Sequence, residues 1–433
     1  MTQYQTPKGM RDYSGALMER RLRMLRSIES VYRRWGYQAL STPAMESVET
    51  LNAKSGAAGL VSSAEIAGQL FKIEDSGLAL RFDLTVPLAR FAANQSLPKP
   101  YKRYCVAPVW RREEPQKGRM REFLQADADI IGCPSMRAEA ELLAMAAEAL
   151  GAIGITKFEI LLNSRMILSG VVEKLGLGKS ETEVFRALDK LEKIGEDGVR
   201  SELEAAGVDG AAAKKLLALV SGEKDGDNEA QLKKAAAYSK EGAEQLRQII
   251  TMLETEYGLD TVRVELSLVR GLGYYTGPIF EIKAGDGIGS VAGGGRYDKL
   301  LEIYGQPDSA VGISLGIERL MALEEESKES KSPASPTQAL VVEIGIEPAQ
   351  RAQVMEIARK LRAEGIAVET DLNERNMRKQ LEYANANSIP FAIIVGKKEL
   401  ETGLYALKDL QSGQQESLKL DAAAKKIKQA AGK

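Results

Sequence analysis

The chain has 433 residues, of which 44% are hydrophobic and 28% charged, and its formal net charge is −2. This composition is typical of a globular protein and excludes a disordered or fibrous chain. The sequence has no N-terminal apolar stretch of the length that a signal peptide needs and no run of about 18 apolar residues, so we expect a cytoplasmic protein that does not span a membrane.

The residues that are absent limit the chemistry. The sequence contains no histidine, which excludes the commonest general base, the commonest metal ligand and every nucleophile that is paired with histidine. Its two cysteines, Cys105 and Cys133, are too far apart for a CxxC pair, so we predict neither a disulfide framework nor a metal site. We therefore expect a reaction that depends on charge, on positioning and on groups of the substrates themselves.

In chain order, the first part of the sequence predicts a mixture of helices and strands. Apolar residues at three- and four-residue steps predict a helix that starts near Met18 and ends at Gly36. Residues 101–111 and 121–132 read as two strands joined by a turn, which is a hairpin. Further strands are expected at 77–84 and 157–162, and a helix at 137–150.

The rest of the chain divides by composition. Residues 169–258 are rich in Ala, Lys, Glu and Leu and predict a helical insertion, after which strands resume and a helix carrying Leu315, Ile317 and Leu320 follows. Residues 326–337 are charged and rich in Ser and Pro, which is typical of a linker. Strands and helices alternate in 338–433, which predicts an α/β domain with a parallel sheet. Since 169–258 is an insertion, the two segments on either side of it, 1–168 and 259–325, are expected to form one domain.

The predicted hairpin carries the first candidate site. Its turn, WRREEPQKGRMREF at 110–123, has Arg111 on the outgoing strand and Arg119 and Arg121 on the returning side. Planar and permanently charged guanidinium groups suit phosphate oxygens. The alternative is an ordinary solvated hairpin whose charges have no ligand.

Two glycine-containing stretches are further candidates. LVRGLGYYTG at 268–277 combines Arg270 with two glycines and with the pair Tyr274 and Tyr275, which suits a small polar ligand or, alternatively, a β-turn with core tyrosines. SVAGGGRYDKL at 290–300 has three consecutive glycines before Arg296 and Tyr297. A strand of this kind packs poorly by itself, so we expect a ligand or another backbone against it.

Charged residues inside apolar segments complete the candidates. Arg319 lies on an otherwise apolar helix, where it needs a phosphate or a carboxylate as partner. RFDLT predicts Asp83 and Thr85 on one face of a strand, and QADAD does the same for Gln125, Asp127 and Asp129. Acids in such positions are costly unless they are paired, and a substrate ammonium, an imidazole or a neighbouring arginine would serve.

Taken in this order, the stretches resemble the histidyl-tRNA synthetase family of class II aminoacyl-tRNA synthetases. WRREEPQKGRMREF is similar to the second class II motif, AVGISLGIERL to the third and GYQALSTPAMES to the first. LVRGLGYYTG and AGGGRYDKL resemble the two histidine-specific signatures of the family, and RFDLT and LLNSRMIL resemble its archaeal and eukaryotic branch. The resemblance covers nearly the whole chain.

The resemblance implies an α+β catalytic domain, in which helices flank an antiparallel sheet of six or seven strands. It also implies a helical insertion, a C-terminal α/β anticodon-binding domain and a homodimer. The implied reaction is the ATP-dependent ligation of L-histidine to its tRNA through histidyl-adenylate, with Mg²⁺ accompanying ATP. Gly273 and Glu114 depart from residues common in the family, Asp and Arg respectively, and Glu114 lies in the turn that would contact tRNA.

The resemblance also assigns roles to individual residues. The catalytic residues would be Arg111 and Arg270, both at the α-phosphate. The ATP-binding residues would be Arg111, Glu113, Arg119, Phe123 and Arg319. The histidine-binding residues would be Asp83, Thr85, Gln125, Asp129, Arg270, Tyr274, Tyr275 and Tyr297. The acceptor end of the tRNA would meet Gln116 and Arg121.

Two other functions are compatible with parts of this pattern. A regulatory paralogue that senses histidine for a biosynthetic enzyme would share the sheet and the histidine pocket. Such proteins usually lack the anticodon-binding domain and lose the arginines that bind ATP, whereas Arg111, Arg270 and Arg319 are all present here. A synthetase of the same subclass for another amino acid would lack the two histidine-specific signatures.

Overall fold

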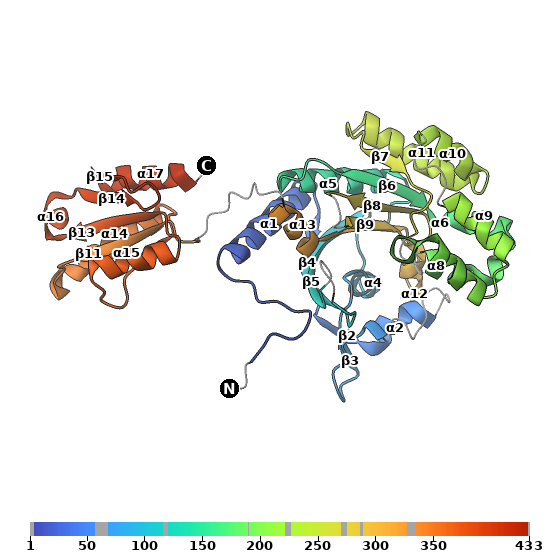
Figure 1. Cartoon of the computed structure of the whole chain (residues 1–433), viewed down its shortest axis with the longest axis horizontal. Helices are drawn as coiled ribbons and strands as arrows, with labels where there is room; N and C mark the ends of the chain where they lie inside the picture. The colour runs from blue at the N-terminus through green and yellow to red at the C-terminus, as the bar shows by residue number, and fades with distance from the viewer. Residues whose placement is uncertain are drawn as a thin grey trace. The chain divides into compact units, whose positions relative to one another are not determined.

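The structure is a computed structural model that describes residues 4–56, 68–115, 120–188, 190–220, 227–269, 275–285, 289–326 and 335–431. The chain forms two compact units (Figure 1). The larger unit contains Met1–Arg11 and Met24–Lys328, and the smaller contains Asp12–Arg23 and Glu329–Lys433. None of the described helices is both long enough and apolar enough to cross a bilayer.

The larger unit is built on a sheet with the strand order β1-β4-β5-β10-β9-β8-β6-β7. The strands are β1 (Gln38–Ala39), β4 (Tyr101–Trp110), β5 (Glu122–Ile131), β6 (Glu159–Ser164), β7 (Val262–Val264), β8 (Pro278–Lys283), β9 (Ser290–Arg296) and β10 (Ala310–Gly316). The run from β4 to β6 in this order is antiparallel throughout. The short edge strand β1 pairs in parallel with β4, and the other edge strand, β7, pairs in parallel with β6. The sheet is therefore mixed, and it has more strands than the expected antiparallel sheet.

The hairpin predicted from the sequence is confirmed. β4 and β5 pair from Tyr101 opposite Ile131 to Trp110 opposite Glu122. Because side chains alternate along a strand, one face of β5 is apolar and the other carries its polar residues. The apolar face lies under helices α1 (Gly15–Arg34) and α5 (Arg137–Ala152), and the α1 hydroxyl of Tyr32 donates to the carbonyl of Ala126 at 3.1 Å.

The prediction that Asp83 and Thr85 share a strand face is wrong. Strand β3 (Leu78–Leu80) pairs with β2 (Met45–Ser47) and ends before Asp83, and helix α4 (Thr85–Ala93) begins at Thr85. The physical reason is a hydrogen bond at the helix start: the Asp83 carboxylate accepts from the amide of Val86 at 3.0 Å, which satisfies a donor that a helix start leaves unpaired.

The expected helix around Leu315 is also partly wrong. Leu315 lies in β10, which hydrogen-bonds to β5 on one side and to β9 on the other, and helix α13 (Ile317–Glu326) begins only at Ile317. A short apolar run fits a buried strand as well as a helix, so only its pairing partners decide between them. Arg319 does lie on the helix, as predicted.

Between β6 and β7 the described residues form helices joined by turns, and no strand occurs among them. They are α6 (Arg165–Lys174), η1 (Gly178–Ser180), α7 (Glu181–Leu188), α8 (Leu191–Ala205), α9 (Gly210–Val220), α10 (Asn228–Ala236) and α11 (Lys240–Thr255). Their buried side chains, such as Phe185 and Leu216, form one core cluster with Leu161 and Ile279 of the sheet. The helical segment is therefore packed onto the sheet through a continuous apolar core. The remaining helices of this unit are α2 (Val48–Gly56) and α12 (Asp298–Ile303).

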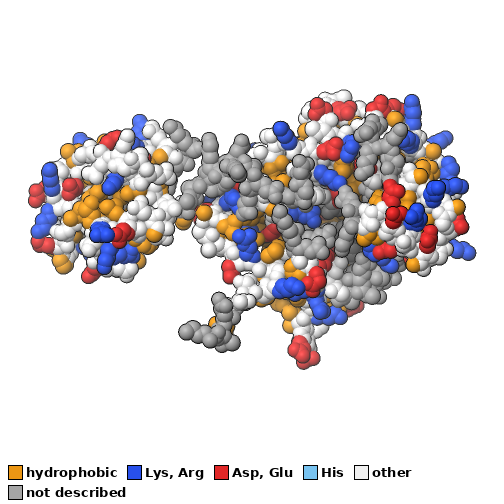
Figure 2. Space-filling model, in the orientation of Figure 1, with side chains coloured by type: hydrophobic (Ala, Val, Ile, Leu, Met, Phe, Trp, Pro, Cys, Tyr) orange, Lys and Arg blue, Asp and Glu red, His pale blue; other side chains and the backbone are white. Residues whose placement is uncertain are grey.

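The smaller unit has a five-stranded sheet in the order β12-β11-β13-β14-β15. Its strands are β11 (Ala339–Ile344), β12 (Val368–Thr370), β13 (Phe391–Gly396), β14 (Tyr405–Asp409) and β15 (Gln415–Leu418), and its helices are η2 (Pro348–Gln350), α14 (Arg351–Ala363), α15 (Met377–Ala386), α16 (Lys397–Thr402) and α17 (Leu420–Ala431). The parallel sheet is confirmed for β11, β12 and β13, whereas β14 and β15 add an antiparallel edge. Basic and acidic side chains are intermixed on the visible face of this unit (Figure 2).

The glycine run of β9 is explained by another backbone. A Cβ atom added to Gly294 would lie 1.9 Å from the carbonyl oxygen of Gly312 on β10 and 2.7 Å from Cε2 of Phe280. Both distances are far below van der Waals contact. Of the two explanations left open by the sequence, close approach of a neighbouring strand is therefore sufficient for Gly294.

We predict that Gly294→Ala destabilises the larger unit by about 3 kcal/mol or more, because the added methyl group overpacks the sheet. The melting temperature measured by calorimetry should fall clearly. Gly151→Ala is the matched control, since a Cβ there meets nothing within 4 Å and Gly151 lies in α5. Equal melting temperatures for the two variants would contradict the packing argument.

Candidate functional site

A buried ion pair lies at the centre of the polar face of the large sheet. Arg103 of β4 and Asp129 of β5 face each other in register, and the Arg103 Nη2 atom lies 2.7 Å from the Asp129 Oδ2 atom. The hydroxyl of Tyr297 donates to the other carboxylate oxygen at 2.5 Å. Burial raises the pKa of Asp129, while Arg103 and Tyr297 stabilise its ionised form. Of the partners considered from the sequence for this acid, the structure supplies a neighbouring arginine.

The surrounding backbone leaves room for this pair. A Cβ atom added to Gly312 would lie 2.0 Å from the Asp129 Oδ1 atom, so only glycine fits opposite the carboxylate. Arg103 also donates to the carbonyl of Leu84 at 3.2 Å, at the start of α4. The pair therefore fixes the position of α4 as well as that of β4 and β5.

Next to this pair, two buried acceptor oxygens have no donor. The amide Nε2 of Gln125 donates to the hydroxyl of Ser314 on β10 at 2.8 Å, and this hydroxyl bonds to the carboxyl of Asp127. The remaining oxygens, Oε1 of Gln125 and Oδ1 of Asp127, are buried without a hydrogen-bond partner in the described part of the chain. Burial raises the pKa of Asp127 to about 7. Such atoms are costly unless a ligand supplies donors.

Asp83 adds a third carboxyl group to this region. It is buried, and its charge raises the pKa of both Asp127 and Asp129. Three acidic side chains thus act on one another, and Arg103 is the main opposing charge on Asp127 and Asp129. This arrangement favours a cationic ligand group beside the acids. Thr85, half-buried, begins the helix that follows Asp83.

Of the three tyrosines predicted for the pocket, Tyr275 and Tyr297 lie among the described residues. Tyr297 is buried and contacts Asp129 directly. Tyr275 packs against β9, because a Cβ added to Gly295 would lie 3.0 Å from its Cδ1 atom. Arg270, Tyr274, Gln116 and Arg119 lie outside the described residues, so their predicted roles remain predictions.

Arg111 begins the second half of the candidate site, at the end of β4. Its Nε atom donates to the carbonyl of Phe82 at 3.0 Å, and its guanidinium carbon lies 5.1 Å from the ring centroid of Phe123. A carbonyl and an aromatic ring orient the guanidinium without neutralising it. Arg111 therefore offers a positive charge in a fixed position at the end of β4, and its binding to a phosphate stays a prediction.

Arg121, on the returning side of the hairpin, contacts other residues of the same turn. Its Nε atom donates to the carbonyl of Glu113 at 3.0 Å, and Nη2 lies 3.3 Å from the carboxylate of Glu114. The amide of Arg121 also donates to the carbonyl of Gly9 at 2.7 Å, so the N-terminal segment contacts the turn. Arg319 is anchored differently: its Nη1 atom donates to the carbonyl of Ser290 on β9.

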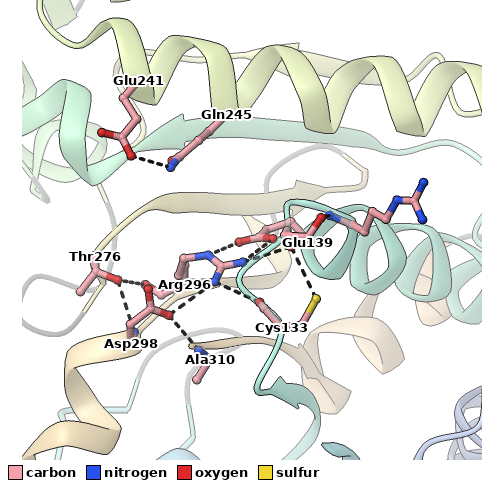
Figure 3. Close-up of polar contacts among 10 residues, drawn as sticks. Cys133, Glu139, Glu241, Gln245, Thr276, Arg296, Asp298 and Ala310 are labelled. Atoms are coloured by element: carbon pink, nitrogen blue, oxygen red, sulfur yellow. Dashed lines mark hydrogen bonds and ion pairs between the residues drawn. The ribbon is translucent and has the colours of Figure 1, made fainter. Parts of the chain in front are cut away.

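A second buried ion pair holds Arg296, the residue that directly precedes Tyr297. Arg296 of β9 forms a bidentate pair with Glu139 of α5, with Nε–Oε1 and Nη2–Oε2 distances of 2.6 and 2.8 Å (Figure 3). The pair belongs to a network that includes the carbonyl of Cys133 and the carboxylate of Asp298. The hydroxyl of Thr276 accepts from the amide of Asp298 at 3.3 Å. Through Asp298, the network thus joins Arg296, which directly precedes Tyr297, to Thr276, which directly follows Tyr275.

Arg103, Glu139 and the pairing role of Arg296 were not identified from the sequence. The usable signal was a charged residue inside an apolar segment: Arg103 lies within a predicted strand and Glu139 within a predicted helix. Such residues need a partner, but the partner lies up to 157 positions away in the chain. Among the described residues, no group of three or more Cys, Asp and Glu could hold a metal ion.

Comparisons with known proteins agree with this architecture. The model of the histidyl-tRNA synthetase family matches residues 9–320, and an anticodon binding domain model matches 338–430. Histidine–tRNA ligase of Cytophaga hutchinsonii is 37% identical over 97% of this chain and 98% of its own length, and that of Aeropyrum pernix is 39% identical over 97% of both. The crystal structure of histidyl-tRNA synthetase from Nostoc sp. PCC 7120 is 29% identical, with a TM-score of 0.83 over 99% of this chain and all of that one.

We predict that Glu139→Gln destabilises the larger unit by about 3 kcal/mol or more, because it leaves a buried arginine without its counter-ion. Glu148→Gln on the same helix is the control: Glu148 is 43% exposed and pairs with the exposed Arg34 at 2.7 Å, so about 1 kcal/mol or less is expected. Melting temperatures measured by calorimetry distinguish the two. An equal, small effect of both substitutions would show that the Arg296 pair adds little stability.

Proposed function

The chain belongs to the histidyl-tRNA synthetase family, and from this premise we propose how its side chains carry out the ATP-dependent ligation of histidine to tRNA. The observation that carries this function is that the synthetase model and the anticodon binding domain model both match within one chain, at 9–320 and 338–430. The polar face of the large sheet, with its acidic half and its arginine-bearing half, gives the proposal its chemical content.

The acidic half is proposed to bind histidine. Asp83, Thr85 and Gln125 surround the α-amino group, and Asp129 and Tyr275 bracket the imidazole, with Tyr274 and Tyr297 lining that pocket. The contacts of Tyr297 support this: since its hydroxyl donates to Asp129, its oxygen is left as an acceptor for an imidazole N–H. A site that hydrogen-bonds the ring rejects amino acids that leave those groups unpaired.

The arginine-bearing half is proposed to bind ATP. Arg111 holds the α-phosphate, Arg319 and Arg119 the farther phosphates, and Glu113 and Phe123 the adenine. The cation–π contact and the carbonyl bond that orient Arg111 support its role, because both leave its charge available to a phosphate. Mg²⁺, in this proposal, is bound chiefly by the phosphates of ATP, as is usual for this ion in nucleotide sites.

The proposed reaction is an in-line attack of the histidine carboxylate on the α-phosphorus. The P–O bond to the β-phosphate breaks as the acyl-phosphate bond forms, giving histidyl-adenylate and pyrophosphate. Arg111 and Arg270 stabilise the charge on the phosphoryl oxygens, and no protein base is needed because the nucleophile is already an anion. In a chain without histidine, we propose that a phosphate oxygen of the adenylate accepts the ribose hydroxyl proton during transfer.

The division of the chain follows the same proposal. Residues 1–168 and 259–325 form the catalytic domain, 169–258 the helical insertion, 326–337 the linker and 338–433 the anticodon-binding domain. Gln116 and Arg121 meet the acceptor end of the histidine tRNA. We further propose a homodimer that works in the cytoplasm, as the family resemblance implies.

Pyrophosphate exchange into ATP tests the function directly. We expect exchange with the purified protein to depend on histidine and on none of the other nineteen amino acids, because only an imidazole satisfies the buried donors and acceptors. A protein that binds histidine by calorimetry but gives no exchange with any amino acid would instead be a histidine-sensing regulatory paralogue.

The role of Arg111 is tested by Arg111→Ala in the same assay. We expect kcat to fall about 100-fold or more, because a donor aimed at the developing phosphoryl charge is removed. The adjacent Arg112→Ala is the control, since Arg112 is an exposed residue of the same loop. If both variants lose activity equally, the loop as a whole matters and Arg111 has no special role.

A further inference from the structure

We propose that Asp127 is a further specificity-determining residue: with Gln125 it binds the α-ammonium group of histidine, and this binding releases the proton of its carboxyl group. The inference rests on the proposed function and adds to it a residue and a proton-linked step. It starts from the two buried acceptor oxygens, Oδ1 of Asp127 and Oε1 of Gln125, that lack a partner in the described part of the chain.

Ser314 of β10 orients both side chains. It lies directly opposite Asp127 in the β5–β10 ladder, and its hydroxyl accepts from Nε2 of Gln125 at 2.8 Å. The single hydroxyl proton is then directed to Asp127, to which Ser314 is hydrogen-bonded. Oε1 of Gln125 and Oδ1 of Asp127 are then the buried oxygens of these two side chains that have no partner in the described part of the chain. A ligand that donates to both must carry several N–H groups, as an ammonium does.

The charges around Asp127 favour a cation at this position. Arg103 and Cys105 face it from β4, Asp129 from β5 and Asp83 from the turn before α4, while Arg81 and Tyr32 act from farther elements. The guanidinium of Arg103 is the opposing charge, but its Nη2 atom pairs with Asp129 and bonds to the carbonyl of Leu84. Asp127 therefore has no ion pair of its own among the described residues.

The distance along the strand fits the substrate. Asp127 and Asp129 are two residues apart on one face of β5, which separates them by about 7 Å. This span is comparable to that between the two nitrogen-bearing ends of an extended histidine. With the imidazole at Asp129, the α-ammonium therefore falls beside Asp127 and Gln125.

Histidine binding releases a proton from Asp127 for an electrostatic reason. Burial raises the pKa of Asp127 to about 7, with Asp129 and Asp83 acting in the same direction and Arg103 opposing them. A cation in contact with the carboxyl group favours its ionised form and lowers the pKa. The fraction of Asp127 that is protonated near neutral pH then loses its proton, so histidine affinity should rise as the pH increases through 7.

Titration calorimetry of the full chain with L-histidine tests this. Heats measured at pH 7 in two buffers of different ionisation enthalpy give the number of protons released, and we expect roughly half a proton per histidine from Asp127. The analogue 3-(imidazolyl)propionate, which lacks the amino group, should release none through this residue. This comparison needs no substitution, so it also holds if a variant at Asp127 does not fold.

The variant Asp127→Asn should abolish this release and raise the KM for histidine in pyrophosphate exchange about 10- to 100-fold, because a charge-assisted hydrogen bond is lost. Asp371→Asn is the control, the same change at a buried acid of the smaller unit. This inference alone would be overturned if the wild type exchanges pyrophosphate with histidine but Asp127→Asn changes neither the KM for histidine nor the proton release. A wild type with no histidine-dependent exchange would overturn the proposed function, and this inference with it.

Discussion

The polar face of the large sheet depends on one interaction, the buried ion pair between Arg103 and Asp129. Removing two charges from water is costly and is offset only by good geometry and further hydrogen bonds. Here the 2.7 Å contact is completed by the Tyr297 hydroxyl on one side and the Leu84 carbonyl on the other. One pair thereby ties β4 to β5, to the start of α4 and to the segment after β9, and the last three carry Gln125 and Asp129, Thr85, and Tyr297 of our proposed histidine site.

Small residues and a second ion pair make this arrangement possible. Gly312 leaves the space that the Asp129 carboxylate occupies, and Gly294 lets β9 and β10 approach closely. Arg296, next to Tyr297 in sequence, is held by Glu139 of α5. The position of the Tyr297 hydroxyl is thus fixed from two sides, by its own bond to Asp129 and by the anchored residue before it, so that little side-chain freedom is left to lose when a ligand binds.

The two halves of the site differ in charge, and this suits two different substrates. Asp83, Asp127 and Asp129 surround the proposed amino-acid position, whereas Arg111 and Arg319 mark the proposed nucleotide position. A chain without histidine cannot use an imidazole base, and the proposed adenylation does not need one because a carboxylate is the nucleophile. Asp127 is the group suited to exchange a proton near neutral pH, since its burial raises its pKa to about 7.

Local periodicity was enough to place the elements whose pattern is long or repeated, and the motifs were enough to identify the family. The β4–β5 hairpin, the helices between β6 and β7, and the α/β character of the smaller unit all follow from local periodicity and turn residues. Short segments were decided by tertiary structure: Asp83 lies at a helix start, where it accepts from the Val86 amide, and Leu315 lies in a strand because β5 and β9 flank it. The sequence named Asp129 and Tyr297 but not Arg103 or Glu139, because the partner of a buried charge is set by strand register and helix packing between residues distant in the chain.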